Sequence, residues 1–427
     1  MKKDEIIVFL ISLIPQIILI YFSPSTLLWD ENVYLANAKH VLGITPYFEY
    51  FRFPLLWWLL VPLIFLFGVN LWIIKIFLIT IFSLSIIFLY KILKDIEDNF
   101  LINLMFIILV VFNGLILFWT NKIYPDVLGM SFLIFSIYFF YKYLKNEKKT
   151  DLILYSLFAV LSFLTKYTYG IWFISIFFLK KKDTIKALSL FLIFLLPYFI
   201  YNIILYNNPI YIFIEQFELA YKWQNREDIS KFLDNLASYI GFYLIFLIFP
   251  PKSKFEKSLY LYSILSMIYL AFFVPQKDPR YLIQILPIPI IILRNKIKEI
   301  PFSKIILFFF LYINLVYSIA LGIYFIIDTY ICYGPFSSVY QSIEFLRNVN
   351  ATRVISNSFW VWYGNHLNIP AYSIYNDSLD LFIKEYEPDY IVYSKNYGLN
   401  VSLDLSKYKL VFSYVDICGI DVKIYKV

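Results

Sequence analysis

The chain has 427 residues, of which 61% are hydrophobic and 22% aromatic, and its mean hydropathy is +0.71. A soluble domain is nearer half apolar, so this composition excludes an ordinary soluble protein. The formal net charge of +7 does not indicate nucleic-acid binding, because the Lys and Arg residues lie mostly in short loops between apolar runs. We therefore predict a polytopic α-helical membrane protein.

Eleven apolar segments are predicted to cross the membrane, since a span requires roughly 20 apolar residues, or fewer where helices are packed or distorted. In chain order they are 5–22, 70–90, 101–119, 127–141, 152–164, 170–179, 184–206, 236–250, 258–274, 281–293 and 302–326. No small-residue cleavage site follows the first segment, so it is predicted to be a retained span and not a signal peptide. The two short segments 152–164 and 170–179 are predicted to form a tight hairpin.

One apolar stretch, 54–67, is left out of the spans. As a helix its 14 residues would cover only about 21 Å, and the hydrocarbon core is about 30 Å thick. Together with Pro62 and the aromatic residues at its start, this favours an interfacial or re-entrant juxtamembrane helix. The Lys and Arg residues then gather in the loops on one side, which predicts a multi-pass plasma-membrane protein with a cytoplasmic N-terminus and an extracytoplasmic C-terminal region.

The composition changes after the last span, where apolar runs shorten to strand length. Strands are predicted at Arg353–Ser356, Ala371–Tyr375, Asp389–Ser394, Tyr408–Tyr414 and Val422–Val427, and helices at Ser338–Asn348 and Leu379–Tyr386. We therefore expect a transmembrane domain over 1–328, whose first outer loop at 23–69 is the candidate catalytic loop, and a small extracytoplasmic α/β domain over 329–427.

Two further features of the C-terminal region bear on its location. All three Asn-x-Ser/Thr sequons lie here, at Asn350, Asn376 and Asn400, which agrees with an outside location. The only cysteines are Cys332 and Cys418, without CxxC or zinc spacing. A disulfide between them and two free thiols are both open at this stage.

The acidic pair Asp30-Glu31 follows the first span and is the strongest candidate for chemistry. Asp30 could simply be the N-cap of a helix over Glu31–Val41. Alternatively, a juxtamembrane helix would hold Asp30 at its tip as a general base or a metal ligand. Asp126 follows Pro125 at the start of a later span, where it could also cap the helix, bind an acceptor or orient the first carboxylate.

Three cations lie at the ends of apolar segments on the predicted outer side: Arg52, Lys166 and Arg280. Each could snorkel to lipid headgroups. A fixed guanidinium is, however, a preferred partner for a phosphate. Three cations and several carboxylates on one face indicate a site for an anionic, lipid-borne substrate.

Metal and nucleotide sites have little support in the sequence. His40 and His366 are the only histidines, and no pairing at ligand spacing exists, although a divalent metal at Asp30 is left open. With 11 glycines the chain also has no Gly-rich phosphate loop. No cofactor is therefore predicted with certainty.

The order of these motifs resembles the GT-C superfamily of membrane glycosyltransferases, in its dolichyl-phosphate-mannose protein mannosyltransferase and aminoarabinose transferase branch. In chain order, the residues that carry the resemblance are Asp30, Glu31 and Tyr34, then Pro54-Leu55-Leu56-Trp57-Trp58, Phe67-Gly68, Asp126, Leu164–Gly170 and Arg280-Tyr281-Leu282 with Pro287. The resemblance runs from residue 1 to about 295. Where relatives often carry an acidic residue, a Lys or a second Pro before the Pro-Leu segment, this chain has Arg52-Phe53, which suggests a cationic role for Arg52.

The resemblance implies transfer of a hexosyl or pentosyl group from a polyprenyl-phosphate donor, of the dolichyl-phosphate type, to a protein, lipid or glycan of the cell envelope. Asp30 would be the general base of an inverting displacement, supported by Glu31 and Asp126. Arg280, Lys166 and Arg52 would meet the lipid phosphate, and Tyr34 and Tyr281 other parts of the substrates.

Two other classes of protein remain open at this point. A transporter or lipid flippase would also place charges near the membrane, although a clear inverted repeat is missing from the sequence. A non-catalytic subunit of a cell-envelope glycan assembly could carry the same C-terminal domain without needing the acidic pair.

Overall fold

The computed structural model describes residues 2–22, 27–223, 227–297, 304–375, 379–399, 401 and 403–427. Two of the predicted sequons, Asn376 and Asn400, lie outside these residues. The chain divides into two compact units. The first unit comprises Met1–Tyr21, Phe51–Leu56 and Lys75–Ile323, and the second Phe22–Tyr50, Trp57–Ile74 and Tyr324–Val427.

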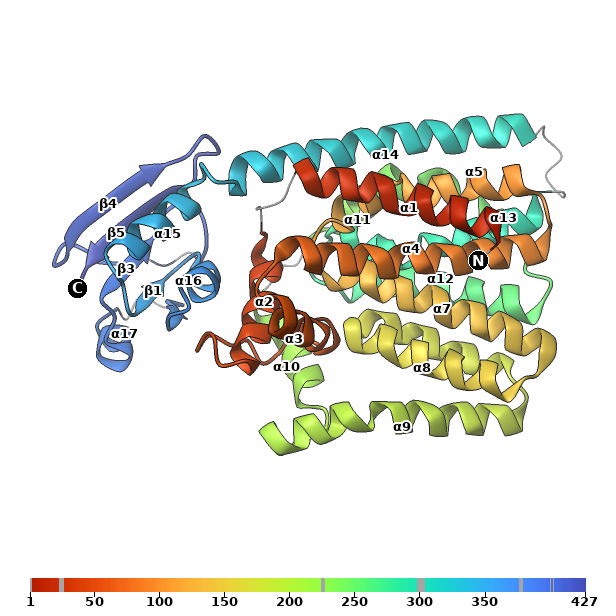
Figure 1. Ribbon diagram of the computed structural model, residues 1–427, viewed down its shortest axis with the longest axis horizontal. Coiled ribbons are helices and arrows are strands. Elements are labelled where there is room, and N and C mark those ends of the chain that lie inside the picture. Colours follow the sequence, from red (N-terminus) through yellow and green to blue (C-terminus); the bar gives the residue numbers. More distant parts are fainter. Residues whose placement is uncertain are drawn as a thin grey trace. The chain divides into compact units, whose positions relative to one another are not determined.

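The first unit is helical (Figure 1). Its α-helices, some of which run past its boundaries, are α1 (Lys3–Phe22), α4 (Leu71–Ile96), α5 (Phe100–Val111), α6 (Gly114–Trp119), α7 (Pro125–Asn146), α8 (Lys149–Thr165), α9 (Lys181–Tyr206), α10 (Tyr211–Trp223), α11 (Ile229–Ile240), α12 (Lys254–Phe272), α13 (Pro287–Lys296) and α14 (Lys304–Tyr333). Three 3₁₀-helices join them: η1 (Tyr167–Phe178), η2 (Gly241–Ile248) and η3 (Pro279–Gln284). Within the described residues, five helical stretches are long and apolar enough to cross a membrane: α1, α4, α7, α9 and Phe308–Asn348, which includes most of α14. The predicted count of eleven spans is therefore not confirmed.

Several predicted spans prove to be broken helices. The segment 101–119 divides at Asn113, whose side chain accepts a hydrogen bond from the Leu115 N–H at 3.0 Å and so starts α6. The segment 170–179 is the 3₁₀-helix η1, and Pro287 begins α13 after η3 within the segment 281–293. An apolar run specifies burial but not the type of helix, so these breaks come from local capping groups and proline.

Helices α7, α8 and α9 lie side by side (Figure 1). Pro125 occupies the first turn of α7, and Glu147 ends the helix in a left-handed conformation with φ of 54°. Aromatic side chains join α7 to its neighbours: the Phe88 ring of α4 lies 4.9 Å from Tyr138, and Tyr141 lies 4.9 Å from Phe255 of α12. The first unit is thus a bundle with rigid, closely packed helix ends.

The second unit combines helices with a sheet. Its helices are α2 (Trp29–Val41), α3 (Leu55–Phe67), α15 (Ser338–Asn348), α16 (Trp360–Leu367) and α17 (Leu379–Tyr386). Its strands are β1 (Val354–Ser356), β2 (Ala371–Ser373), β3 (Tyr390–Tyr393), β4 (Lys409–Val415) and β5 (Asp421–Lys426). Every strand and both helices predicted for the C-terminal region are found, whereas α16 was not predicted.

The five strands follow the order β2-β1-β3-β5-β4. β1 pairs in parallel with β2 and β3, and β5 pairs antiparallel with β3 and β4. Successive residues of a strand point to opposite faces. Accordingly, Ile355 and Ile391 pack with Phe382 of α17, whereas Val354 and Val392 pack with α15 and α16.

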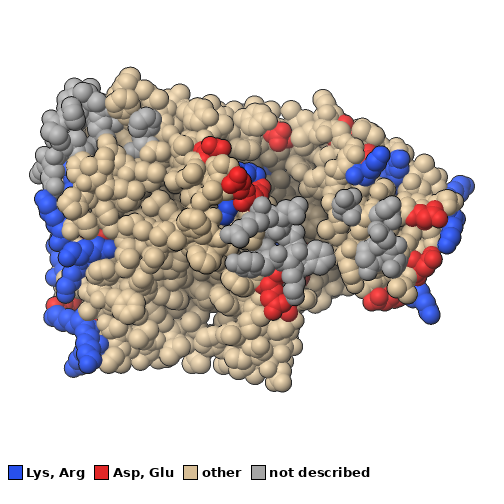
Figure 2. Space-filling model, turned by 180° about the vertical axis from the view of Figure 1, so that it is seen from behind, with Lys and Arg blue, Asp and Glu red and all other residues tan. Residues whose placement is uncertain are grey.

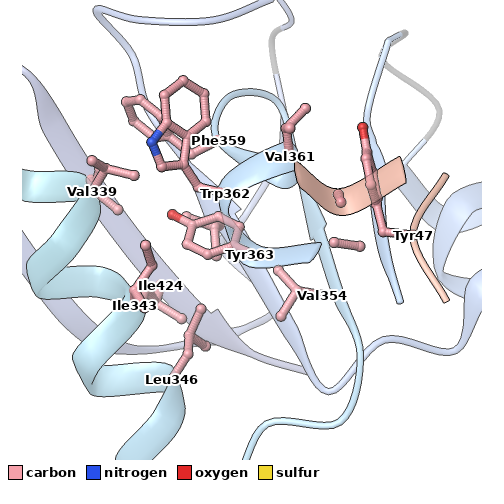
Figure 3. Packing of buried hydrophobic residues seen from close by; sticks show 14 of the residues in the cluster. Tyr47, Val339, Ile343, Leu346, Val354, Phe359, Val361, Trp362, Tyr363 and Ile424 are labelled. Atoms are coloured by element: carbon pink, nitrogen blue, oxygen red, sulfur yellow. The ribbon is translucent and has the colours of Figure 1, made fainter. Parts of the chain in front are cut away.

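The core on the α15 and α16 face also includes residues far away in the sequence (Figure 3). Val33 and Ala36 of α2 and Tyr47 belong to the same buried cluster as Trp362. A disulfide joins Cys332 to Cys418 across 86 residues, which answers the question that the sequence left open. The helix that carries the acidic pair is therefore built into the core of the second unit.

The contact between Gly364 and Tyr47 gives a first prediction. A Cβ at position 364 would lie 2.6 Å from Cγ of Tyr47 and 2.8 Å from its Cβ, and a rotamer change does not move that Cβ. We expect Gly364→Ala to lower the stability of the purified protein by about 1–3 kcal/mol, measured as a fall in melting temperature. Gly241→Ala is the control, because the nearest atom to its added Cβ is 4.0 Å away. Equal melting temperatures for the two variants would contradict the close packing.

Candidate active site

A buried ion pair lies where α7 begins and α8 ends. Lys166 Nζ lies 2.5 Å from Asp126 Oδ1, and the two side chains are 11% and 2% exposed. Tyr169 donates a hydrogen bond of 2.5 Å to the backbone carbonyl of Asp126. The second carboxylate oxygen, Oδ2, is buried and has no hydrogen-bond partner among the described residues. The structure thus gives Asp126 a cationic partner 40 residues further along the chain, a pairing that the sequence did not predict.

Arg280 occupies the same site through Tyr281. The Lys166 Nζ lies 3.9 Å from the centroid of the Tyr281 ring, and the Arg280 Cζ lies 5.5 Å from it. The guanidinium also lies 5.1 Å from the Tyr124 ring and 5.5 Å from that of Trp119. Cations bind the faces of such rings, most strongly where water is excluded. Two cations therefore lie close to the same aromatic ring.

The local sequence explains how Arg280 is held beside these aromatic rings. Asp278 caps η3 by accepting a hydrogen bond from the Arg280 N–H at 2.9 Å, and Pro279 presets the first turn. The Asp278 carboxylate also lies 3.3 Å from Arg280 Nε. A guanidinium held by a carboxylate and by ring faces has little freedom, unlike an Arg that snorkels to the surface.

Arg52 lies near this group along a chain of aromatic contacts. Its guanidinium lies 5.0 Å from the ring of Phe51. The next residue, Phe53, is buried and packs 5.9 Å from Tyr167, which follows Lys166 in the chain. The structure therefore brings together Asp126, Lys166, Arg280 and Tyr281, with the Arg52 segment anchored beside Tyr167.

The acidic pair has different surroundings in the second unit. Helix α2 begins at Trp29 with Leu28 as its N-cap, so the interpretation of Asp30 as the N-cap is wrong. Asp30 lies in the first turn and is half-buried, whereas Glu31 is fully buried and accepts a hydrogen bond from the Leu28 N–H at 2.8 Å. Glu31 thus satisfies one of the unpaired amides at the helix start, which leaves Asp30 as the more accessible carboxylate. Tyr34, one turn further, is 3% exposed.

Polar side chains on α2 bind α16 within the second unit. The Lys39 ammonium donates to the backbone carbonyl of Asn365 and to its Oδ1 at 3.2 Å. The Asn365 amide in turn donates to Asn32 Oδ1 at 2.7 Å. All three side chains are buried, so they fix the rotation of α2 against α16. The sequence offered no signal for this network, because its members lie more than 300 residues apart.

The buried Lys39 gives a prediction on pH dependence. Burial lowers the pKa of Lys39 from 10.5 to about 8. Between these values the unfolded chain binds more protons than the folded one, so stability rises with pH from about 8 to 10.5. We expect this rise in stability, of roughly 3 kcal/mol at most, for the wild type and not for Lys39→Met. It is measured from melting curves recorded at a series of pH values between 8 and 10.5. The same slope in both proteins would exclude Lys39 as its source.

The described part of the chain contains no recognisable metal site. No three His, Cys, Asp or Glu side chains gather there at a spacing that could hold an ion. His40 Nδ1 lies 3.1 Å from the Thr45 carbonyl. Burial, with Lys39 and Arg347 adding to it, lowers the pKa of His366 to about 4, so its ring is neutral at pH 7. The divalent metal suggested for Asp30 stays a prediction.

Residues that the sequence did not single out complete both groups: Trp119, Tyr124, Tyr169 and Asp278 around the cations, and Asn32, Lys39 and Asn365 behind the acidic pair. Tyr124 and Asp278 each stand two residues before a predicted site residue, so spacing alone could have suggested them. Trp119 lies within an apolar run and carries no such signal.

Comparisons with known proteins agree with the sequence resemblance. Residues 52–205 match the family model described as dolichyl-phosphate-mannose-protein mannosyltransferase. A crystal structure of ArnT from Cupriavidus metallidurans bound to undecaprenyl phosphate is similar, with a TM-score of 0.65 and 10% identity over 99% of this chain and 96% of that one. The same protein in the apo state gives a TM-score of 0.62 and 10% identity over 93% of both chains. No curated protein sequence matches the chain. The chain therefore has the fold of ArnT over nearly its whole length, and its residues 52–205 match the mannosyltransferase family model.

Proposed function

We propose that this protein is a polyprenyl-phosphate-dependent glycosyltransferase that transfers a sugar to an acceptor outside the cytoplasm. The observation that carries the proposal is the pair of fixed cations, Lys166 and Arg280, which both lie close to the Tyr281 ring. A lipid phosphate released in the reaction needs such positive charge. The fold shared with ArnT, which has been crystallised with undecaprenyl phosphate, supports the same substrate class.

An apolar groove near Lys166 supports the proposal of a donor with a long lipid tail. It begins four residues after Lys166 and has a volume of about 490 Å³. Its lining comes from η1 and α12: Gly170, Ile171, Phe173, Ile174, Ile176, Phe177, Leu265, Ile268, Tyr269 and Phe273. The ring of Tyr269, which lines the groove, lies 6.4 Å from the ring of Tyr167, the neighbour of Lys166. A lipid whose phosphate meets Lys166 and Arg280 would thus have an apolar surface nearby for its tail.

In the proposed reaction the acceptor oxygen forms a bond to the anomeric carbon as the bond from that carbon to the phosphate oxygen breaks. Asp30 takes the acceptor proton, and the bonding electron pair leaves with the phosphate, which Arg280 and Lys166 stabilise with Arg52. Asp126 keeps the Lys166 ammonium in place. Its suggested role toward the acceptor or Asp30 stays a prediction, as do the substrate contacts of Tyr34 and Tyr281.

The proposed topology has a cytoplasmic N-terminus and an extracytoplasmic C-terminal region. The disulfide supports it, because disulfides persist in oxidising compartments. We expect Asp380→Cys to react with an impermeant thiol reagent added to intact cells, and Lys148→Cys to react only after lysis. Both positions are exposed, and the native cysteines are paired and give a low background. Labelling of position 148 alone in intact cells would reverse the topology.

Mass analysis of the lipid that co-purifies with the protein tests the proposed function. We expect a polyprenyl phosphate or its glycosylated form with the wild type, and much less of it with a Lys166→Gln/Arg280→Gln variant. Glycerophospholipids alone in both samples would argue against a polyprenyl-phosphate enzyme and favour a transporter or an assembly subunit.

A further inference from the structure

A second site lies at the other end of α7, far from Asp126. There a cavity of about 450 Å³ opens between the ends of α7, α9, α12 and α13, all in the first unit. Its volume lies within the range of about 300–1,000 Å³ that is usual for ligand sites. Since α7 has 22 residues and rises by about 1.5 Å per residue, roughly 30 Å separate this α7–α12 cavity from the Asp126–Lys166 pair. It is therefore distinct from the proposed phosphate site.

The inner lining of the α7–α12 cavity is largely apolar. Leu144 of α7, Phe178 at the end of η1, Leu259 of α12 and Ile291 of α13 all contribute to it. These side chains offer a surface for a hydrocarbon chain, and polar ones such as Tyr143 and Asn295 complete the lining. The occupant must thus have an apolar part.

The opening of the cavity is basic. Lys145, Lys180 and Lys254 line it, and all three are exposed. Lys254 begins α12 and forms no ion pair with a carboxylate of the described residues. Figure 2 shows the same tendency on a larger scale, with Lys and Arg side chains gathered at one end of the bundle.

The acidic residues of the lining are all paired with cations, one of them with a lysine of the opening. Glu147 pairs with Lys180 at 2.6 Å, and Asp183 pairs with Lys186 at 2.8 Å. The buried Glu256 accepts a hydrogen bond from the Ser253 N–H at 3.3 Å and lies 3.6 Å from Lys296. Each carboxylate is therefore already engaged. Lys180 is in turn paired with Glu147, and Lys145 lies 3.9 Å from Asp95 at the surface. Among the described residues Lys254 has no such pair, and its charge at the opening favours an anion.

We propose that the α7–α12 cavity binds an anionic phospholipid of the adjacent leaflet, with its phosphate at Lys254, Lys145 and Lys180 and an acyl chain against the apolar lining. Basic pockets between transmembrane helices are suited to such headgroups. The lipid joins the ends of four helices, so its binding stabilises the bundle. This inference does not depend on the proposed transferase activity.

The test compares the melting temperature of the full-length protein in detergent with added phosphatidylglycerol, phosphatidylcholine of the same chains, or inorganic phosphate. We expect only phosphatidylglycerol to raise it. In Lys145→Gln/Lys180→Gln/Lys254→Gln the lipid concentration that gives half of the rise in melting temperature should increase by about tenfold to a hundredfold. The reason is that each lysine near the headgroups adds to the attraction for an anionic lipid, and the variant loses all three. The control Lys384→Gln/Lys407→Gln/Lys409→Gln removes three exposed lysines from the second unit and should respond like the wild type.

The other outcomes overturn the proposal. An equal effect of phosphatidylcholine would mean that only the apolar lining matters, and an equal effect of inorganic phosphate would assign the site to a free anion. A triple variant that responds like the wild type would remove the lysines from the site. If the triple variant does not fold, Lys254→Glu gives the same decision, because that exposed side chain has no ion pair to lose among the described residues and the reversed charge should repel the lipid.

Discussion

Asp30→Asn is expected to abolish sugar transfer while the protein keeps its expression level and melting temperature. The acceptor hydroxyl must lose its proton as it attacks, and losing a general base typically costs about 10²–10⁴-fold in rate. The amide of Asn matches the shape of the carboxylate but cannot take the proton. Because Asp30 is half-buried in the first turn of α2 and is not the helix cap, the substitution should not disturb the helix. Turnover is measured as release of polyprenyl phosphate from the glycosylated lipid.

Two variants serve as controls for this result. Asp380→Asn removes an exposed carboxylate of the same unit, which lies 3.6 Å from Lys407 on the surface, and should leave turnover unchanged. Glu31→Gln should be milder than Asp30→Asn, since a Gln oxygen can still accept the Leu28 N–H. Near-normal turnover by Asp30→Asn would remove Asp30 from the mechanism.

Periodicity predicted the elements of the C-terminal region well. Alternating residues and clear end signals define β1, β3, α15 and α17, and their predicted bounds agree with the structure within one residue or so. Helix α16 was missed because its eight residues, rich in aromatics, follow a short strand without a recognisable cap. Sequence patterns thus predict best those elements whose ends are marked by recognisable capping or turn residues.

The candidate site was predictable only as a set of residue types. Asp126, Lys166 and Arg280 were each recognised by their position at the end of an apolar run, yet their contacts depend on how α7, α8 and η3 pack. The same holds for Arg294, which follows the predicted span 281–293 directly in the sequence. It is fully buried, pairs with Glu97 at 2.7 Å and donates to Asn103 at 2.6 Å. These contacts, which the sequence did not predict, make Arg294 a structural residue, because breaking a buried pair destabilises the fold.

Arg280→Lys is expected to weaken the binding of a polyprenyl phosphate by roughly 1.5–3 kcal/mol, the worth of one charge-assisted hydrogen bond. A Lys offers a point charge without the planar fork that binds two phosphate oxygens. The surroundings of Arg280 favour a phosphate ligand over an anchor to lipid headgroups. The side chain is only 13% exposed, is held by Asp278, and packs over the rings of Trp119, Tyr124 and Tyr281.

Titration of the purified variants with a soluble short-chain polyprenyl phosphate measures the effect, which should appear as an increase in Kd of about tenfold to a hundredfold. Arg347→Lys is the matched control, since Arg347 is 49% exposed and forms a surface pair with Glu344. A snorkelling Arg280 would tolerate Lys as well as Arg347 does. Equal affinities for the three proteins would therefore leave Arg280 as an anchor. The phosphate contact would then pass to Lys166, whose ammonium Asp126 already holds in place, and to Arg52.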